Sequence, residues 1–542
     1  MCMVTNITFI SGFIGDVCKM KRYLFLLLVL LSMPSLRGQI SGWNVRLEEK
    51  TLSAWSGAQS FSAAAWNNQM LVVGGRSAGL HIRHPFAAFL VSEANASIHV
   101  IDPANLTHWA LPVDSLPIAV QDQFLSTNMQ SVQQDSILYL MGGYGYMNSL
   151  AMHSTHGRIT AIHVPQMIAA IQQGNGAAAR AAVRTWADPR FAWTGGVARE
   201  LNGQVFLAGG QFFHGSYNPM GPNHGPGFSQ NYHDGYVHFS LIDDGDSLAV
   251  MNFTFVTDSA LMHRRDYNMT HTMDPSTGAL RLTAFSGVFQ PGANLPWHDM
   301  VDLSPAGLSL RIGASQLLNQ YHSAHFGLWD SVNSTFSTVF LGGIGEYLVQ
   351  SDGSLIQDPN VPFTKHISAI VETPNGSSEY YLGDMPDFLG AGAEFFPIHS
   401  AMQHGIISTA ELPTLPNATV LIGYMVGGIR STGPNIFFSN GSNLSTSNDK
   451  IFEVWLDASG IGVPSEVLVQ NWAQFDQAGQ LRLGGRDLSA SDVCAYDSSG
   501  RIVYHGALWA NVEGYTLPES LTWEPGAYTL RFDSGESLRA VK

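Results

Sequence analysis

The sequence predicts an all-β protein made mainly of one repeated strand unit, with a smaller β unit at the C-terminus. Composition, a recurring strand that ends in paired small residues, and a change of pattern near residue 465 lead to this prediction. The 542 residues are 45% hydrophobic and 13% charged, and 55 are glycine. Soluble domains are usually about a quarter charged, so this composition excludes a disordered chain or a coiled coil. A net charge of −16 argues against charge-driven binding of nucleic acid.

The N-terminal segment, residues 1–38, is predicted to be a secretory signal peptide. The basic pair Lys21–Arg22 precedes an apolar run at residues 23–31, which is too short to span a bilayer. A start at Met20 leaves this signal intact. Cleavage at its end leaves Cys494 as the one cysteine, so the mature fold is expected to depend on its core and not on a disulfide. We expect a secreted or outer-surface protein with no transmembrane segment in the mature chain.

A short β-run that ends in paired small residues occurs six times. The pairs are Gly74–Gly75, Gly142–Gly143, Gly209–Gly210, Ser286–Gly287, Gly342–Gly343 and Gly427–Gly428. Each run follows a turn and another strand-like segment, and a variable loop then leads to an alternating strand such as Ser97–Asp102. Strand, turn, strand, loop and outer strand form the pattern of a β-propeller blade. The glycines are expected to permit positive φ and close backbone approach where inner strands crowd near the axis.

These runs resemble the kelch family of β-propellers, in which a hydrophobic strand ending in Gly-Gly marks each blade. The resemblance implies a kelch-like propeller over residues 39–464. It has six blades, or seven if Tyr381–Asp384 starts a blade of its own. The pairs are 56 to 85 residues apart, so long loops are expected. The Ala-rich stretch Gln166–Trp186 is predicted to be a helical insertion after the second blade.

The C-terminal part, residues 465–542, is predicted to be a small β-sandwich. Its hairpin and last strands resemble the type A C-terminal sorting domain of the type IX secretion system. The residues that match this motif are Asp497, Gly500–Arg501, Gly526, Tyr528 and Lys542. The resemblance implies a Bacteroidetes-type bacterium and export by the type IX machinery, after which such a domain is usually removed. An ordinary small β-sandwich, such as a carbohydrate-binding module, is the alternative.

The sequence contains none of the common catalytic motifs. We find no Gly-x-Ser-x-Gly, no His-Glu-x-x-His, no phosphate loop and no Gly-x-Gly-x-x-Gly after a strand. The predicted propeller has no cysteine, which excludes the copper-radical mechanism of galactose oxidase, a kelch-like protein that needs a Cys–Tyr cross-link. We therefore expect no cofactor and no metal.

Histidine is frequent, with 20 in the chain, and several recur at equivalent places in the repeats. Equivalent positions of a propeller lie in a ring on one face, where imidazole, arginine and carboxylate groups can bind a ligand or move protons. The catalytic candidates are Arg264, Arg265, His322, Glu394 and His399. The binding candidates are His153, His156, His214, Tyr217, His233, Asp234, Tyr267 and Tyr321. The alternative for each histidine is a backbone contact between blades, and for Arg265 a structural ion pair with Asp266 or with a neighbouring blade.

The favoured function is a binding or interaction module for a glycan or protein ligand. One alternative is a carbohydrate-active enzyme resembling the kelch-type sialic acid epimerases, which use Arg, Glu and His without a cofactor. A second is a structural or adhesion protein. A deep axial funnel that brings an Arg, a His and a carboxylate together would favour the enzyme.

Overall fold

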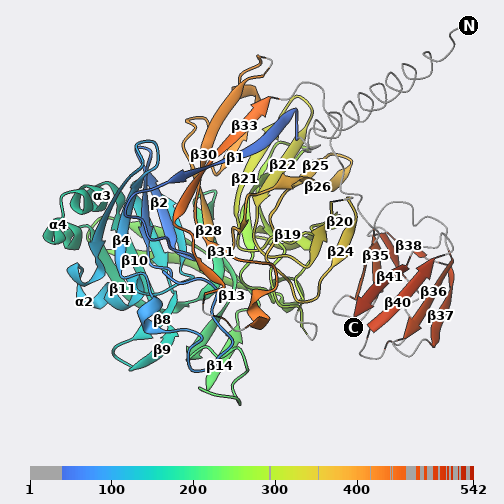
Figure 1. Ribbon diagram of the computed structural model, residues 1–542, viewed down its shortest axis with the longest axis horizontal. Helices are drawn as coiled ribbons and strands as arrows, with labels where there is room; N and C mark the ends of the chain where they lie inside the picture. The colour runs from blue at the N-terminus through green and yellow to red at the C-terminus, as the bar shows by residue number, and fades with distance from the viewer. Residues whose placement is uncertain are drawn as a thin grey trace, which may run out of the picture. The chain divides into compact units, whose positions relative to one another are not determined.

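The computed structural model describes residues 40–458, except 292–294, 352, 416, 440 and 442, together with strands beyond residue 458. The predicted signal peptide, residues 1–38, lies outside the described residues. The described chain is all-β apart from a few short helices (Figure 1). In this part of the chain no helix has the length and hydropathy needed to cross a membrane.

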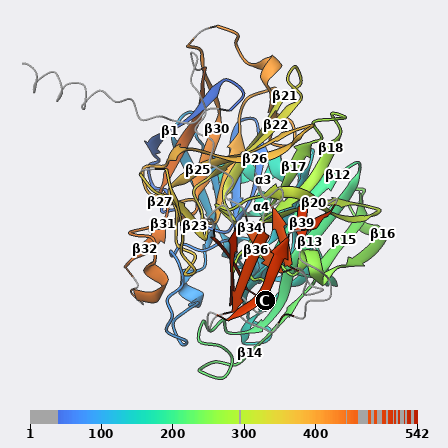
Figure 2. The ribbon, with the colours of Figure 1, turned by 90° about the vertical axis from the view of Figure 1, so that its right-hand side faces the viewer.

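Six sheets, each with four principal antiparallel strands, follow one another along the chain. The first consists of β2 (Ser62–Trp66), β3 (Gln69–Val73), β4 (Ser97–Asp102) and β5 (Thr107–Pro112). The second consists of β6 (Gln130–Gln134), β7 (Ile137–Met141), β10 (Gly157–His163) and β11 (Val183–Ala192). The third consists of β12 (Thr194–Leu201), β13 (Gln204–Gly215), β15 (Gly235–Asp243) and β16 (Leu248–Thr257), which lie side by side in Figure 2.

The fourth sheet consists of β17 (Asn268–Met273), β18 (Leu280–Phe285), β19 (Asp299–Ser304) and β20 (Gly307–Ser315). The fifth consists of β21 (Ala324–Asp330), β22 (Thr335–Leu341), β25 (His366–Thr373) and β26 (Gly376–Asp384). Residues Tyr381–Asp384 end β26 in that sheet, so they do not begin a sheet of their own. The sixth consists of β28 (Ala393–Pro397), β30 (Thr419–Gly427), β33 (Lys450–Ala458) and β1 (Trp43–Thr51).

The sixth sheet takes its outer strand from the beginning of the described chain. β1 pairs antiparallel with β33 from Trp43 opposite Ala458 to Thr51 opposite Lys450, and Figure 1 shows β1 beside β33. A strand that precedes the first sheet in sequence thus completes the last one.

Shorter elements surround these sheets. The strands are β8 (Tyr144–Met147), β9 (Met152–Thr155), β14 (Phe228–Tyr232), β23 (Tyr347–Val349), β24 (Leu355–Gln357), β27 (Phe388–Leu389), β29 (Ile406–Ser408), β31 (Ile429–Ser431) and β32 (Ser445–Ser447). The α-helices are α2 (Ile118–Phe124), α3 (Val164–Gln172), α4 (Gly176–Ala181) and α5 (Ser259–Met262). The predicted helical insertion corresponds to α3 and α4, but its last residues, 183–186, belong to β11 because they pair with β10.

The paired glycines bind neighbouring sheets together. A Cβ on Gly142 would lie 2.0 Å from the carbonyl oxygen of Trp193, and one on Gly342 would lie 1.8 Å from that of Leu389. Both glycines have a φ of +65°, so glycine is required for space and for conformation. In five of the six pairs the second glycine donates its N–H to a carbonyl at the start of the neighbouring sheet. Gly428 of the sixth sheet donates to Ala58 O, before the first sheet, at 2.9 Å.

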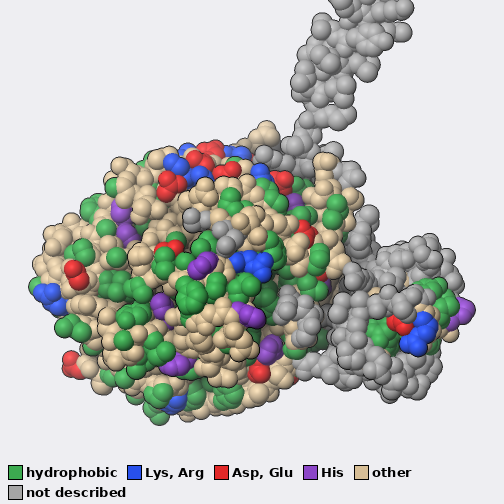
Figure 3. Space-filling model, turned by 60° about the horizontal axis from the view of Figure 1, so that its bottom comes forward, with side chains coloured by type: hydrophobic (Ala, Val, Ile, Leu, Met, Phe, Trp, Pro, Cys, Tyr) green, Lys and Arg blue, Asp and Glu red, His purple; other side chains and the backbone are tan. Residues whose placement is uncertain are grey.

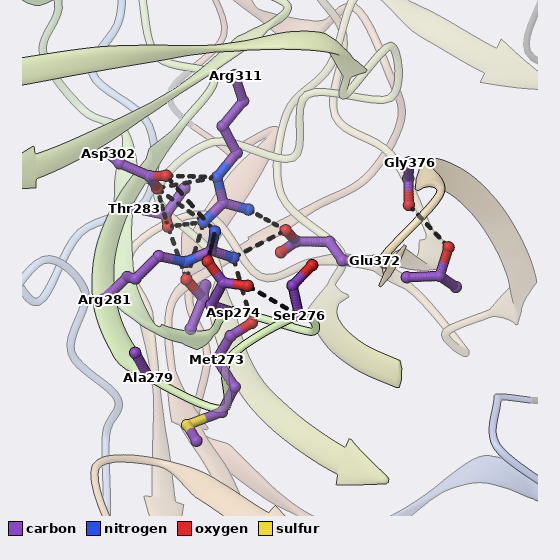
Figure 4. Close-up of polar contacts among 12 residues, drawn as sticks. Met273, Asp274, Ser276, Ala279, Arg281, Thr283, Asp302, Arg311, Glu372 and Gly376 are labelled. Atoms are coloured by element: carbon purple, nitrogen blue, oxygen red, sulfur yellow. Dashed lines mark hydrogen bonds and ion pairs between the residues drawn. The ribbon is translucent and has the colours of Figure 1, made fainter. Parts of the chain in front are cut away.

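Ion pairs also join the fourth and fifth sheets (Figure 4). The carboxylate of Glu372 on β25 pairs with Arg311 on β20 and, at 3.1 Å, with Arg281 on β18. Arg311 in turn lies 2.7 Å from Asp302 on β19. In Figure 3 hydrophobic side chains and scattered histidines cover much of the face, and charged side chains gather at its upper edge.

The C-terminal region contains two further antiparallel sheets. One consists of β34 (Trp472–Phe475), β35 (Leu481–Gly484), β39 (Gly514–Thr516) and β38 (Trp509–Asn511). The other consists of β37 (Ile502–Ala507), β36 (Asp492–Asp497), β40 (Ala527–Phe532) and β41 (Ser537–Val541). β36 and β37 form the predicted hairpin, and Arg501 Nε lies 2.9 Å from Asp497 Oδ2. Gly500, Gly526 and Lys542 of the predicted sorting motif lie outside the described residues.

Candidate functional site

A ring of residues lies where the six sheets begin: five of them just precede the first strand of their sheet, and one is the second residue of β12. Its members are Ser60, Asn128, Gly195, Asp266, His322 and Gly392, and all six have positive φ. Backbone N–H groups connect them, as from Asn128 to the carbonyl of Ser60 at 3.0 Å and from Ser60 to that of Gly392 at 2.9 Å. Between Asp266 and His322 the connection is made by Asn268, whose Oδ1 accepts from Ser323 N at 2.9 Å. The contacts therefore run through all six sheets and return to the first. We call these residues the lead-in ring.

Two further sets of six residues lie beside this ring. The first set directly precedes it: Gln59, Thr127, Thr194, Arg265, Tyr321 and Ala391. The second set directly follows the paired small residues: Arg76, Tyr144, Gln211, Val288, Ile344 and Ile429. Backbone contacts join the two sets within each sheet, as in Gln59 with Arg76 and Arg265 with Val288. The lead-in ring and both sets all line one cavity of about 650 Å³.

A smaller cavity of about 70 Å³ borders the lead-in ring as well. Five ring residues line both cavities, all except Gly392. Arg199 and Glu394 line the smaller one. Burial lowers the pKa of Arg199 and raises that of Glu394, and the attraction between the two groups opposes both shifts. This cavity has room for little more than water.

Arg76 supplies a buried cation to the larger cavity. It is 4% exposed, its Nη2 pairs with Glu93, and its Cζ lies 3.7 Å from the ring centroid of Phe89. Burial lowers its pKa, and the charge of Glu93 opposes that shift. Nη1 is buried without a hydrogen-bond partner among the described residues. This guanidinium thus has an N–H edge left for a ligand acceptor.

Arg265 supplies a second cation. Its Nη1 lies 3.8 Å from Asp266 Oδ2, and its Cζ lies 5.0 Å from the ring centroid of Phe289. Burial lowers its pKa, but attraction to Asp266, Tyr232 and Tyr217 outweighs burial, so the pKa is raised overall and the group stays charged. Its Nε is buried and has no hydrogen-bond partner in the described part of the chain.

Aromatic rings make up much of the remaining wall. The ring of His81 lies 4.7 Å from Tyr217 and 5.5 Å from Phe437, between centroids. Burial, helped by the charge of Arg76, lowers the pKa of His81 to about 3, so its imidazole is neutral near pH 7. Tyr144 is held in place because its hydroxyl donates to Gly215 O at 2.7 Å and accepts from Tyr217 N at 2.9 Å. The wall therefore combines fixed rings with two cations.

Some of the predicted site residues meet at these cavities. Arg265, His322, Tyr217 and Tyr321 line the larger one. Glu394, Tyr267 and again His322 line the smaller one, although the Tyr267 hydroxyl is engaged by Ala208 O at 2.7 Å. Arg265 also has the predicted ionic contact with Asp266, at 3.8 Å, so it is both a wall residue and a member of an ion pair.

Arg264 and His399 have surroundings unlike those of Arg265. Arg264 is fully buried and donates to Leu261 O, Ser286 O and Asp299 Oδ1 at 2.7, 2.9 and 2.8 Å. His399 follows β28, and its Nδ1 accepts from Ala401 N at 3.3 Å. Neither residue lines the two cavities.

The other predicted binding residues make contacts within the protein. The backbone N–H groups of His156 and His233 donate to Gly143 O and Gly210 O, at 2.9 and 3.1 Å. The ring of His153 stacks on Tyr144 at 5.7 Å. His214 Nδ1 lies 3.0 Å from Ser154 Oγ, and Asp234 Oδ1 lies 2.6 Å from His263 Nδ1.

Sequence reasoning missed Arg76, His81, Phe89 and Gln211. Arg76 and Gln211 directly follow a Gly–Gly pair, a position that lines the cavity in all six sheets. Reading the residue after each pair would have found them. His81 and Phe89 lie in the long loop between β3 and β4, which has no repeat-equivalent position. Among the described residues, no group of three or more His, Cys, Asp or Glu side chains is placed to hold a metal.

Comparisons with known proteins gave the following result. No family model and no curated protein matches this chain. Among solved structures 151 chains match. One of them, titled "Structure of YjhT", is 11% identical, has a TM-score of 0.40, and the match covers 75% of this chain and 99% of that chain.

Proposed function

We propose that this protein is a secreted or cell-surface six-bladed β-propeller of the kelch type that binds a small ligand, a glycan, in its larger cavity. The lead-in ring supports the blade count, because hydrogen bonds between its members, with the Asn268–Ser323 bond between the fourth and fifth sheets, run through six sheets and return to the first. The pairing of β1 with β33 supports a propeller joined by its two ends. The axis of such a ring is where blades present equivalent residues to one space.

The observation that favours a small ligand is the cavity, with its two guanidinium groups. Its volume of about 650 Å³ lies within the range of about 300 to 1,000 Å³ of small-molecule sites. Buried N–H groups of Arg76 and Arg265 lack partners among the described residues, and such groups cost free energy unless a ligand accepts from them. Sugars offer hydroxyl acceptors at their edges and C–H faces for rings such as Phe89, Tyr217 and Tyr321.

The proposal is tested on the mature chain, residues 39–542, with a glycan array followed by ligand-observed NMR. Arg76→Gln and Arg265→Gln should each weaken binding at least tenfold. The matched control is Arg190→Gln, because Arg190 is half exposed, pairs with Asp188 and lies away from the cavity. Binding that survives both cavity variants, or an empty array with no NMR response from any sugar, would refute the proposal.

Export through the type IX system forms part of the proposal. The β36–β37 hairpin with its Asp497–Arg501 pair, followed by β40 and β41, supports a sorting role for residues 465–542. Deleting these residues in a type IX-secreting bacterium should leave the propeller in the periplasm, as measured by surface proteolysis. Continued surface display of the deletion variant would refute this part of the proposal.

A carbohydrate-active enzyme is the second candidate. Arg265, Asp266 and His322 come from adjacent sheets and line the same cavity, so an arginine, a carboxylate and an imidazole are available together. An epimerase of this kind should exchange the anomers or epimers of a bound sugar, which NMR detects directly. Arg265→Gln should then abolish exchange with an unchanged unfolding midpoint.

A further inference from the structure

The two halves of the cavity wall differ in chemistry. The residue after the paired small residues is polar in the first three sheets, as Arg76, Tyr144 and Gln211. It is aliphatic in the next three sheets, as Val288, Ile344 and Ile429. These six positions are structurally equivalent, since each is joined by backbone contacts to the residue before the lead-in ring. The difference therefore lies in the side chains and divides these six positions of the wall into a polar and an apolar half.

The apolar half extends beyond these three residues. Phe363, Ala391 and Ile429 form one buried cluster, against which Ile344 and Leu80 pack. All five of these side chains also line the cavity. A ligand made only of hydroxyl groups would lose hydrogen bonds to water against such a surface. A hydrocarbon group placed there gains free energy from leaving water.

Two guanidinium groups fit an acid better than a neutral acceptor: Arg76 in the polar half, and Arg265 on the fourth sheet, where its backbone pairs with Val288. Arg76 has its carboxylate neighbour at Nη2 only, which leaves Nη1 without a partner in the described part of the chain. Arg265 lies 3.8 Å from its nearest carboxylate, longer than a close charged hydrogen bond. A planar guanidinium with a free N–H edge pairs most strongly with a carboxylate.

We infer that the cavity is built for an amphipathic acid: a carboxylate that faces Arg76 and Arg265 and carries an alkyl or aryl arm against Ile344, Ile429 and Phe363. The inference rests on the proposed binding function and specifies its ligand class. An acidic sugar with an apolar substituent belongs to this class, and so does a simple carboxylic acid with a hydrocarbon chain.

The test uses two probe series on the mature chain: acetate, butanoate, hexanoate and 3-phenylpropanoate, and the corresponding primary amides. Affinities come from NMR titration. From acetate to hexanoate the affinity should rise about fourfold per methylene, which corresponds to about 0.8 kcal/mol for each CH₂ buried. Each acid should bind at least tenfold more tightly than its amide.

Variants then assign the two halves separately. Val288→Thr and Ile344→Thr should each flatten the dependence on chain length, because a hydroxyl replaces part of the apolar surface that the arm would cover. Val332→Thr is the matched control, because Val332 is 86% exposed. Arg76→Gln should remove the preference for acid over amide and keep the dependence on chain length.

The outcomes separate this inference from the proposed function. Acids that bind with equal affinity at every chain length, or amides that bind as well as acids, overturn the amphipathic acid and leave a small-ligand site in place. Binding of neutral sugars together with no response to any acid also overturns the amphipathic acid and keeps the small-ligand site. If neither the probe series nor any sugar binds, both the inference and the proposed function fail.

Discussion

Lowering the pH from 7 to 5 is expected to weaken the fold through histidines that are buried in the neutral form. His99, His156 and His271 are each less than a tenth exposed. Burial lowers the pKa of His99 and His271 to about 3 and that of His156 to about 4. His271 Nε2 donates to Glu200 O at 2.6 Å, and His99 Nε2 lies 2.8 Å from Asn95 Oδ1, so both rings are fixed in place.

The sign follows from the proton balance of the two states. Histidine in the unfolded chain has a pKa near 6.5 and takes up a proton between pH 7 and 5, whereas these buried rings stay neutral until about pH 4 to 3. The unfolded state therefore binds more protons, and the free energy of unfolding falls as the pH falls through this window. The pH of 5 lies about 1.5 units below the unfolded-state pKa of 6.5. Keeping one ring neutral in the folded state therefore lowers the free energy of unfolding by about 2 kcal/mol, and keeping all three neutral lowers it by about 6 kcal/mol.

Glu379 acts in the opposite direction. Burial raises the pKa of its carboxyl to about 8, even though it accepts from Leu317 N at 2.7 Å. The folded state holds this proton where the unfolded state has lost it, so acidification from pH 7 to 5 restores about 2 to 3 kcal/mol. The net loss for these four groups is about 3 to 4 kcal/mol, a large part of the about 5 to 15 kcal/mol that stabilises a typical protein.

The assay is urea denaturation of the mature chain at pH 7, 6 and 5, followed by tryptophan fluorescence. His271→Gln should reduce the loss between pH 7 and pH 5 by about 2 kcal/mol, whatever it does to stability at pH 7. The control is His224→Gln at an exposed site, which should leave the loss unchanged. An unchanged pH dependence in His271→Gln would refute the reasoning.

The remaining predictions concern the framework. Arg264→Gln should lower the free energy of unfolding by about 3 to 5 kcal/mol, because it leaves Asp299 without its buried partner. Arg265→Gln should lower it much less. Comparable losses for the two variants in chemical denaturation would contradict this expectation. Gly142→Ala should lower the free energy of unfolding by at least about 3 kcal/mol in the same assay, because its Cβ would lie 2.0 Å from a carbonyl oxygen. Gly174→Ala is the control and should lower it less, because a Cβ there would have no atom within 4 Å. Glu372→Gln should lower the thermal midpoint by several degrees, because Arg281 and Arg311 share its carboxylate; an unchanged midpoint would show that the network adds nothing.

The repeated strands were predictable because their signal is local. A β-run that ends in two small residues can be read in any window, and the structure places a strand there in every repeat, as at β3 and β7. The physical cause of the pattern is a tertiary contact that recurs along the chain, since a Cβ on Gly142 or Gly342 would strike the backbone of the next sheet. The all-β class is therefore confirmed, while the six-bladed ring stays a proposal.

The roles of individual side chains were harder to predict. Arg264 and Arg265 are adjacent in sequence, yet one is engaged by three acceptors and the other lines the cavity. The two residues are of the same type and have nearly the same sequence neighbours. Their different roles therefore depend on where the fold places Asp299 and Asp266. The pairing of β1 with β33 likewise has no local signal, because about 400 residues separate the partners.

That pairing has a consequence for the order of assembly. The nine residues of β1 leave the ribosome before every other strand of the six sheets, but their partner strand ends only at Ala458. Until then β1 has no ladder to join, and the free edge of β30 is open to other strands. Closing so long a loop is slow, and it comes last. Any chain shortened before residue 450 should thus keep an unsatisfied sheet edge at both of its ends and aggregate during synthesis.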